Sequence, residues 1–356
     1  MKHRTPKVLV APLEWGLGHA TRCIPIIREL LNQNADVTIC ATGACKILLE
    51  NEFPDIPLIE IPGIIVHYPK NGKMFLAIAT QIPSILKAIR NEHTELEKII
   101  AAHKFTHVIS DNRFGFYAST VKSAFVTHQI KIKGGKGFKF IENFLFQMNK
   151  KYLDKFNEIW IPDVNTPGNL SGELSNTAGV NNNISYVGML SRFTDKINNQ
   201  IKQYEMVALL SGPEPQRTLL ETKVRAYFLA SGKKCLIIQG LPAKTESYTE
   251  GKVEIIPSIS NSGLMNVLHA ETLLISRSGY STLMDLAILD HRKVLFIPTP
   301  GQTEQEYLAD HLFHTFGYRY IAQHEKIPVD LNFEGKKLPS NNPDNLISTI
   351  KKFLTT

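Results

Sequence analysis

The chain alternates short runs of β-branched and other apolar residues with longer segments in which apolar residues recur at helical spacing. This alternation is typical of βα units that stack into a parallel sheet. The clearest helix is expected at 20–32, because Ile24, Ile27 and Leu30 keep one face apolar. In the first half of the chain, the pattern predicts strands at residues 7–11, 36–41, 58–61, 107–110, 125–128, 158–161 and 185–187.

The second half repeats this alternation, so we expect a second doubly wound α/β unit there. The predicted strands are 206–210, 235–238, 253–256, 273–275 and 294–297, and the predicted helices are 216–230, 264–269, 282–289 and 305–316. Between the halves, residues 188–203 are polar and weakly periodic, as is usual for a connection between domains. The sequence therefore predicts domains at 1–190 and 204–340, followed by a C-terminal helix within 341–356.

Composition narrows the class of protein. A length of 356 residues suits two domains of about 150–180 residues each. The N-terminus lacks the apolar core of a signal peptide, no apolar run approaches the roughly 18 residues of a membrane span, and the four cysteines form no C-x-x-C pair. We therefore expect a cytoplasmic protein without a zinc site or a disulfide framework. The net charge of +7 favours an anionic partner, which is a nucleotide, a nucleic acid or an anionic membrane surface.

A glycine-rich turn follows the first predicted strand and opens a helix, which places it at the carboxyl edge of a parallel sheet, where ligands collect. Gly16 and Gly18 form its G-x-G element, but Thr21 occupies the position of the third glycine of a dinucleotide site. His19 follows directly, and the positive end of a helix disfavours the protonated ring. His19 is therefore the candidate general base, and the alternative is a residue that only caps its helix.

Asp111 ends the fourth predicted strand at the same edge of the same sheet. A carboxylate that holds a histidine fixes its tautomer and stabilises the imidazolium that forms on proton transfer. Asp111 is therefore expected to orient His19. The alternative is an Asp that caps a helix beginning near Gly115.

Two loops of the second half join strands to helices and present hydroxyl and backbone N–H groups that suit phosphate oxygens. Neither loop contains G-K-[ST], and the chain has no Asp-x-Asp, so neither ATP hydrolysis nor a diphosphate-bridging metal is indicated. Helix dipoles and arginine are expected to take the place of the metal. The candidate phosphate-binding residues are Ser211, Gly212, Arg217, Arg277, Ser278 and Gly279.

The run from Ser276 to Gly279, then Asp285, Pro298 and the segment Gln305-Glu306-Tyr307, resembles the C-terminal domain of the MurG-like family 28 glycosyltransferases of the GT-B superfamily. The resemblance implies two Rossmann-like domains that face a central cleft, with acceptor binding in 1–190 and nucleotide-sugar binding in 204–340. It also implies that the two loops hold the donor diphosphate and that Asp285 binds the ribose. Gln305 and Glu306 would bind the donor sugar and select among sugars, although Glu306 stands where the family has a second glutamine.

The segment from Gly16 to Arg22 resembles the family's glycine-rich acceptor loop, and also the G-x-G-H-x-x-R variant found in the UDP-sugar hydrolase of pseudaminic acid synthesis. These likenesses imply a metal-independent, inverting transfer of a sugar from an NDP-sugar, expected to be UDP-linked, to a hydroxyl on a glycan or lipid-linked acceptor. No cofactor is implied. The alternatives are a UDP-sugar hydrolase and a non-catalytic nucleotide-sugar-binding protein.

Lysines and phenylalanines interleave between residues 130 and 155. A basic, aromatic helix suits peripheral binding to an anionic membrane, here the inner face of the cell membrane. The alternative is a core-facing phenylalanine stripe flanked by solvated lysines. Nucleic acid is not favoured as a partner, because no nucleic-acid-binding motif accompanies the basic residues. The aromatic residues concerned are Phe138, Phe140, Phe144 and Phe146.

Overall fold

The computed structural model describes residues 5–63, 74–134, 139–193, 204–268 and 270–355. It separates into two compact units, with the boundary after Ser191. The first unit also takes in Asn341–Thr356, and the second is built from Arg192–Ser340. The predicted connection 188–203 includes this boundary, and its residues 194–203 lie outside the described residues.

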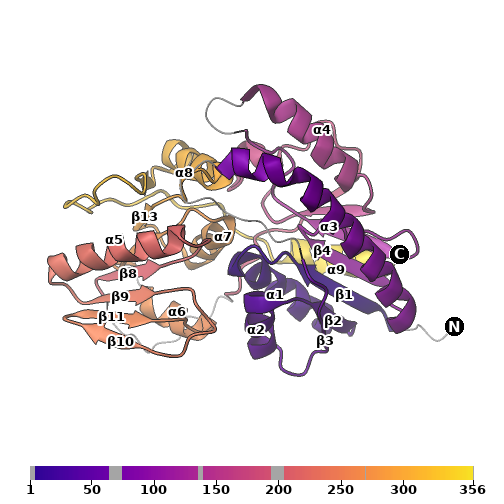
Figure 1. Cartoon of the computed structure of the whole chain (residues 1–356), viewed down its shortest axis with the longest axis horizontal. Coiled ribbons are helices and arrows are strands. Elements are labelled where there is room, and N and C mark those ends of the chain that lie inside the picture. The colour runs from indigo at the N-terminus through magenta and orange to yellow at the C-terminus, as the bar shows by residue number, and fades with distance from the viewer. Residues whose placement is uncertain (1–4, 64–73, 135–138, 194–203, 269, 356) are drawn as a thin grey trace. The chain divides into compact units, whose positions relative to one another are not determined.

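The first unit is built on a seven-stranded parallel sheet with the order β3-β2-β1-β4-β5-β6-β7 (Figure 1). The strand order reverses between β1 and β4, which is the position where doubly wound sheets bind ligands. The strands are β1 (Lys7–Pro12), β2 (Asp36–Cys40), β3 (Leu58–Ile59), β4 (His107–Asp111), β5 (Lys122–Val126), β6 (Glu158–Ile161) and β7 (Asn183–Tyr186). The helices are α1 (Leu17–Asn32), α2 (Gly43–Glu52), α3 (Met74–His103), α4 (Glu142–Leu153) and α9 (Asp344–Thr355), with short 3-10 turns η1 (Lys139–Ile141) and η2 (Gly172–Ser175).

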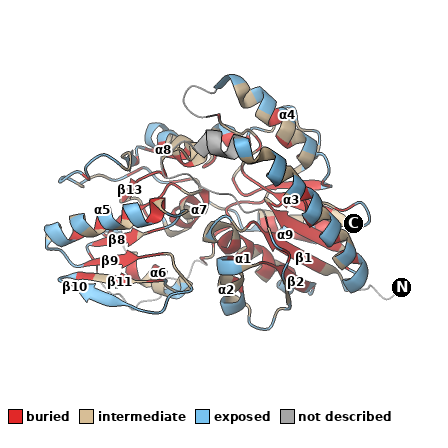
Figure 2. Ribbon diagram, viewed as in Figure 1, coloured by how far each residue is buried: buried red, intermediate tan, exposed pale blue. Residues whose placement is uncertain are grey.

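The second unit repeats this plan with the order β10-β11-β9-β8-β12-β13-β14, in which only the β10–β11 pair is antiparallel. The central strands of both sheets are buried almost throughout (Figure 2), as expected when helices cover both faces of a parallel sheet. The strands are β8 (Met206–Leu209), β9 (Cys235–Ile238), β10 (Tyr248–Glu250), β11 (Val253–Ile256), β12 (Leu273–Ser276), β13 (Val294–Phe296) and β14 (Arg319–Tyr320). The helices are α5 (Gln216–Ser231), α6 (Asn261–Val267), α7 (Tyr280–Leu289) and α8 (Thr303–Phe316).

The C-terminal helix α9 belongs to the first unit. Its Phe353 is fully buried, and the ring centroid lies 5.1 Å from that of Trp160 on β6 and 4.9 Å from that of His107 on β4. The sequence predicted a helix within 341–356, where apolar residues recur at helical spacing. It did not predict the partner, because such a pattern shows that one face is buried without showing against what.

Most predicted elements agree with the structure to within a few residues. The strand predicted at 125–128 is wrong in its bounds, because β5 spans Lys122–Val126. Its first residue is a lysine, whose ammonium pairs with Glu158 at 2.9 Å. The predicted helix 264–269 ends at Val267, and residue 269 lies outside the described residues. The short edge strands β10 and β14 were not predicted, because they are mostly polar or exposed and carry no buried apolar run.

Candidate active site

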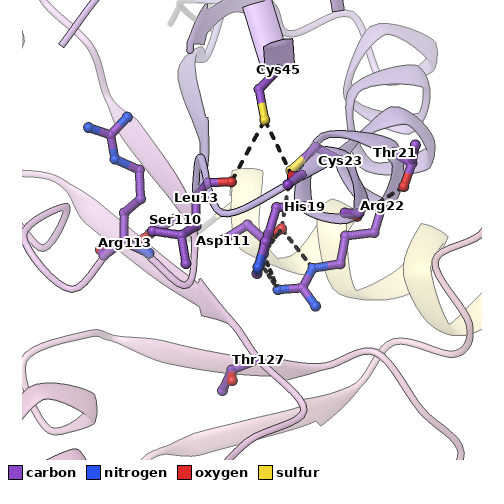
Figure 3. Close-up of polar contacts among 12 residues, drawn as sticks. Leu13, His19, Thr21, Arg22, Cys23, Cys45, Ser110, Asp111, Arg113 and Thr127 are labelled. Atoms are coloured by element: carbon purple, nitrogen blue, oxygen red, sulfur yellow. Dashed lines mark hydrogen bonds and ion pairs between the residues drawn. The ribbon is translucent and has the colours of Figure 1, made fainter. Parts of the chain in front are cut away.

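The carboxyl edge of the first sheet brings the β1–α1 loop beside the end of β4, because Pro12 and Asp111 are register partners in parallel strands (Figure 3). Helix α1 begins at Leu17 and its N-cap is Gly16, with φ of 98°. That backbone conformation is strained for other residues and explains the glycine. His19 therefore lies in the first turn of α1 and Asp111 at the end of β4, as the sequence predicted.

His19 and Asp111 are in contact. The distance from His19 Nδ1 to Asp111 Oδ2 is 3.3 Å, and Asp111 is fully buried. The alternative role for Asp111, as a cap of a helix starting near Gly115, is wrong, because no helix begins between β4 and β5. The geometry thus brings together the proposed base and its proposed orienting carboxylate.

Arg22 is the third member of this cluster. Its Nε donates to Asp111 Oδ2 at 2.7 Å, and one terminal nitrogen donates both to Asp111 Oδ1 and, at 2.8 Å, to His19 Nδ1. Burial raises the pKa of Asp111, but the neighbouring charges of Arg22 and His19 outweigh burial and lower it below its usual value. Asp111 therefore remains a carboxylate although it is shielded from water.

Two further residues complete the surroundings of this cluster. The other terminal nitrogen of Arg22 lies 3.4 Å from Nδ1 of the buried His128, and Cys23 Sγ lies 3.8 Å from Asp111 Oδ2. Burial raises the pKa of the Cys23 thiol well above its usual value, so it is a neutral neighbour. We did not predict Arg22 or His128 as site residues. The signal for Arg22 was present, since residues three apart on a helix share a face.

A buried ion pair fixes the loop that follows Asp111. Arg113 donates through two nitrogens to Glu92 Oε1 on α3, at 3.1 and 2.9 Å, and both side chains are almost fully buried. Arg113 also donates to the Ile61 carbonyl at 3.0 Å. The main-chain N–H and carbonyl of Arg113 both bond to the hydroxyl of Ser110, at 3.1 and 2.7 Å. These contacts hold the end of β4 and thus the position of Asp111.

In the second unit, the N-terminus of α7 is open. Gly279 is its N-cap, and a Cβ built on it would meet no atom within 4 Å. The buried Ser278 hydroxyl donates to the Gln305 carbonyl at 2.7 Å, and Gln305 Oε1 accepts from the Thr299 N–H at 2.9 Å. Ser278 and Gln305 therefore tie the start of α7 to the start of α8, and the open helix end has the form of an anion site.

The two arginines predicted to face the diphosphate are engaged within the protein. Arg277 is fully buried and donates to the carbonyls of Ile297, Pro298 and Gln216, at 2.9, 3.0 and 2.8 Å. Burial lowers its pKa to about 10. Arg217 donates to carboxylates at either side of it, Glu214 and Glu221, at 2.6 Å each. Both arginines thus hold loop backbone and neighbouring side chains, which differs from the predicted phosphate contact.

Of the remaining residues predicted to bind the sugar donor, two are held by partners within the protein and two are exposed. Asp285 pairs with Arg192 at 3.1 Å, and Glu306 Oε1 accepts from the Gly301 N–H at 2.9 Å. Ser211 and Gly212 lie in an exposed turn, where Gly212 has φ of 105°. Beneath this turn lies the buried Thr299.

The basic aromatic segment divides between the two roles considered for it. Phe140 and Phe144 are 79% and 62% exposed, whereas Phe146 is 7% exposed. The ammonium nitrogen of Lys131 lies 3.3 Å from the centroid of the Phe146 ring. Phe138 lies outside the described residues. Among the described residues, no helix combines the length and apolar character needed to cross a bilayer, and no cluster of three or more His, Cys, Asp or Glu could hold a metal ion.

Comparison with known proteins relates both halves to glycosyltransferases. Residues 218–354 match the family model of the glycosyltransferase family 28 C-terminal domain. An uncharacterized glycosyltransferase of Methanosarcina acetivorans is 24% identical over 316 residues, which cover 84% of this chain and 81% of the relative.

Two solved structures show the same fold over nearly the whole chain. Arabidopsis thaliana UGT89C1 in complex with UDP-L-rhamnose has a TM-score of 0.60 at 12% identity, covering 98% of this chain and 94% of that one. MurG of Acinetobacter baumannii has a TM-score of 0.50 at 14% identity, covering 99% and 91%. The two doubly wound units therefore form a GT-B fold, as the sequence predicted.

Proposed function

We propose, from the premise that residues 218–354 form a family 28 glycosyltransferase C-terminal domain, that this protein is a metal-independent, inverting glycosyltransferase. It takes a sugar from an NDP-sugar, with UDP as the nucleotide, and transfers it to a hydroxyl of a glycan or lipid-linked acceptor. One observation carries the proposal. His19 contacts the buried Asp111 at the switch point of the first sheet, where a doubly wound fold binds ligands.

In the proposed reaction, the acceptor oxygen attacks the anomeric carbon while the bond from that carbon to the diphosphate oxygen breaks. The hydroxyl proton passes to His19, and the nucleoside diphosphate leaves with the bonding electrons. His19 suits this role because imidazole gains and loses a proton near neutral pH. Asp111 stabilises the imidazolium that results, in the manner of other carboxylate–histidine pairs.

The second unit is proposed to bind the donor. The N-terminus of α7 at Gly279 offers backbone N–H groups and a positive dipole end to the diphosphate, and the Ser211–Gly212 turn adds further donors. UGT89C1 has been solved with a UDP-sugar, which supports UDP as the nucleotide here. Arg277 and Arg217 are proposed to position these loops, since their nitrogens are bound to protein carbonyls and carboxylates.

Asp285, Gln305 and Glu306 keep their proposed roles toward the ribose and the sugar. Each also has a partner within the unit, namely Arg192, Thr299 and Gly301 respectively. A ribose hydroxyl at Asp285 therefore competes with the Arg192 ion pair. This predicts modest rather than tight binding of the nucleoside alone.

A panel of NDP-sugars, incubated with glycan and lipid-linked acceptors in the presence of EDTA, tests the proposal. Transfer to an acceptor with the chelator present supports a metal-independent transferase, whereas strict dependence on added Mg²⁺ or Mn²⁺ contradicts that part of it. UDP-sugar hydrolysis is the second candidate function, favoured by the G-x-G-H-x-x-R arrangement in which Arg22 joins His19. Free sugar formed equally with and without acceptor would identify the hydrolase. Donor binding without turnover would identify a binding protein.

A peripheral membrane location at the inner, cytoplasmic face is part of the proposal. Phe140 and Phe144 extend into solvent from η1 and α4, and Lys139 and Lys151 are exposed on the same segment. Exposed aromatic rings beside lysines suit an anionic lipid surface. This surface would bring the first unit to a lipid-linked acceptor.

A further inference from the structure

Arg22 holds three functional groups with one guanidinium. It lies on α1, three residues after His19, and is 2% exposed. Its nitrogens contact both oxygens of Asp111 and Nδ1 of His19 (Figure 3). The other terminal nitrogen lies 3.4 Å from Nδ1 of His128. A planar fork of donors can serve several acceptors in a fixed geometry, which a lysine ammonium cannot do.

The chemistry of these contacts decides which nitrogen of His19 carries the proton. Arginine has donors and no acceptor. The terminal nitrogen of Arg22 lies 2.8 Å from His19 Nδ1, so Nδ1 must offer its lone pair to that contact. In the neutral ring, the proton then resides on Nε2. Asp111 Oδ2 is farther from Nδ1, at 3.3 Å, and already accepts from Arg22 Nε at 2.7 Å.

We propose that Arg22 is a positioning residue that holds His19, in the free protein, in the tautomer with the proton on Nε2. The general-base role requires the opposite tautomer, in which Nδ1–H donates to Asp111 and Nε2 offers its lone pair. Arg22 therefore regulates the base, and this inference rests on the proposed function for its catalytic meaning. His19 becomes a base only after Arg22 releases Nδ1.

The release needs little movement. The second proton on the shared terminal nitrogen bonds to Asp111 Oδ1, and Arg22 Nε bonds to Oδ2, so the ion pair survives when the His19 contact breaks. The side chain of His19 is 18% exposed, which gives the ring access to water for exchange of its proton. An acceptor substrate that reorients the His19 ring on binding would thus shift the tautomer of His19 without separating Arg22 from Asp111.

Nuclear magnetic resonance of the histidine ring nitrogens tests the inference directly. Protein labelled with ¹⁵N at histidine is studied at a pH where the ring is neutral, without donor or acceptor, and the His19 signals are assigned by their loss in His19→Gln. We expect a proton-bearing Nε2 and an unprotonated Nδ1 in the unmodified protein. In Arg22→Lys, where the charge beside Asp111 remains but the fork is lost, we expect the proton to move wholly or partly to Nδ1.

His128→Gln is the matched control, because it removes another contact of Arg22 and should leave the His19 tautomer unchanged. A proton on Nδ1 in the unmodified protein would overturn the inference, and so would the same pattern in Arg22→Lys as in the unmodified protein. If Arg22→Lys does not fold, the spectrum of the unmodified protein still decides. No sugar transfer is needed in this experiment, so its outcome is separate from success or failure of the proposed enzymatic activity.

Discussion

The charge of Asp111 is tolerated in the protein interior because Arg22 pairs with both of its oxygens. An intact buried ion pair contributes little net stability, but removal of one partner costs about 3–5 kcal/mol because the other charge is left buried and unpaired. Asp111 is therefore required for stability, whatever its proposed role in catalysis. For this reason, substitution of His19 gives a clearer test of the chemistry than substitution of Asp111.

His19→Ala is expected to lower turnover by about 10²–10⁴, the range typical for loss of a general base. Donor affinity should hardly change, because His19 lies in the first unit and the donor is proposed to bind the second. Steady-state kinetics together with calorimetric titration of UDP measure both quantities. His314→Ala, which changes an exposed histidine on α8, is the control. Turnover unchanged by His19→Ala would rule out the base assignment.

Glu306→Gln is expected to change the order of preference among NDP-hexoses and NDP-N-acetylhexosamines. A site that bonds to a sugar hydroxyl discriminates strongly against a sugar that leaves buried polar groups unpaired. The amide oxygen of Gln can still accept from the Gly301 N–H, so the free energy of unfolding should change by less than about 0.5 kcal/mol. Competition assays with the donor panel give the ranking. An unaltered ranking would show that Glu306 only caps the loop.

The sequence predicted that His19 and Asp111 lie close together, because the loop after β1 and the end of β4 meet at one edge of a parallel sheet. It did not predict that Arg277 would be buried. In the sequence, a basic residue beside a serine–glycine turn is typical of a phosphate ligand. In the folded chain, Arg277 instead donates to three main-chain carbonyls. Long-range main-chain partners of this kind leave no local signature.

At the scale of elements, the N-terminus of α7 is the best candidate for binding the donor diphosphate. Gly279 has φ of −73° and ψ of 139°, which any residue adopts, and its side-chain direction is open. The glycine is therefore not required by backbone conformation. Free space in front of a helix N-terminus is what an approaching diphosphate would need.

Gly279→Val is expected to leave the fold intact and to weaken UDP binding at least about tenfold, since about 1.4 kcal/mol of lost binding energy corresponds to a factor of ten. The isopropyl group would occupy the space in front of the first N–H groups of α7. Calorimetric titration of UDP into Gly279→Ala and Gly279→Val should show a graded loss. Equal affinity in both variants and in the unmodified protein would place the diphosphate elsewhere.

Helix α4 and the η1 turn before it offer a test of the membrane surface. Replacing Phe140 and Phe144 together by Ser should weaken binding to anionic vesicles by more than about tenfold, since burial of each ring is worth about 1.5–3 kcal/mol. The melting temperature should change little, because both rings are exposed. Vesicle flotation and thermal melting give the two readouts.

Phe146→Ala is the matched control for this pair. Its ring is buried in the core formed with Phe125 and Leu153, so its loss should cost about 3–5 kcal/mol of stability. Vesicle binding by the folded fraction should persist. Vesicle binding that is unchanged in the Phe140 and Phe144 double variant would show that these rings do not bind the membrane.

At the scale of the whole molecule, the chain leaves the first unit after Ser191 and returns to it at Asn341. The sequence predicted two α/β units from alternation alone, and this held because each unit forms its own sheet and core. The return of the C-terminal helix to the first unit could not be predicted. Its apolar face could pack on any complementary surface, and in the folded chain Phe353 packs against the rings of Trp160 and His107.

Phe353→Ala tests this arrangement, because both tryptophans of the chain, Trp15 and Trp160, lie in the first unit and report its unfolding selectively. The buried ring of Phe353 packs edge-on against Trp160, so its loss should destabilise the first unit by about 3–5 kcal/mol. The midpoint of the fluorescence transition in urea should fall accordingly. Phe228→Ala, which truncates a fully buried ring in the core of the second unit, should leave that midpoint nearly unchanged while lowering the transition of the second unit followed by circular dichroism. Below the denaturant range in which the first unit unfolds, UDP should bind Phe353→Ala with unaltered affinity, because its proposed site lies in the second unit. A fluorescence midpoint that responds to Phe228→Ala as strongly as to Phe353→Ala would show instead that the two units unfold as one cooperative body.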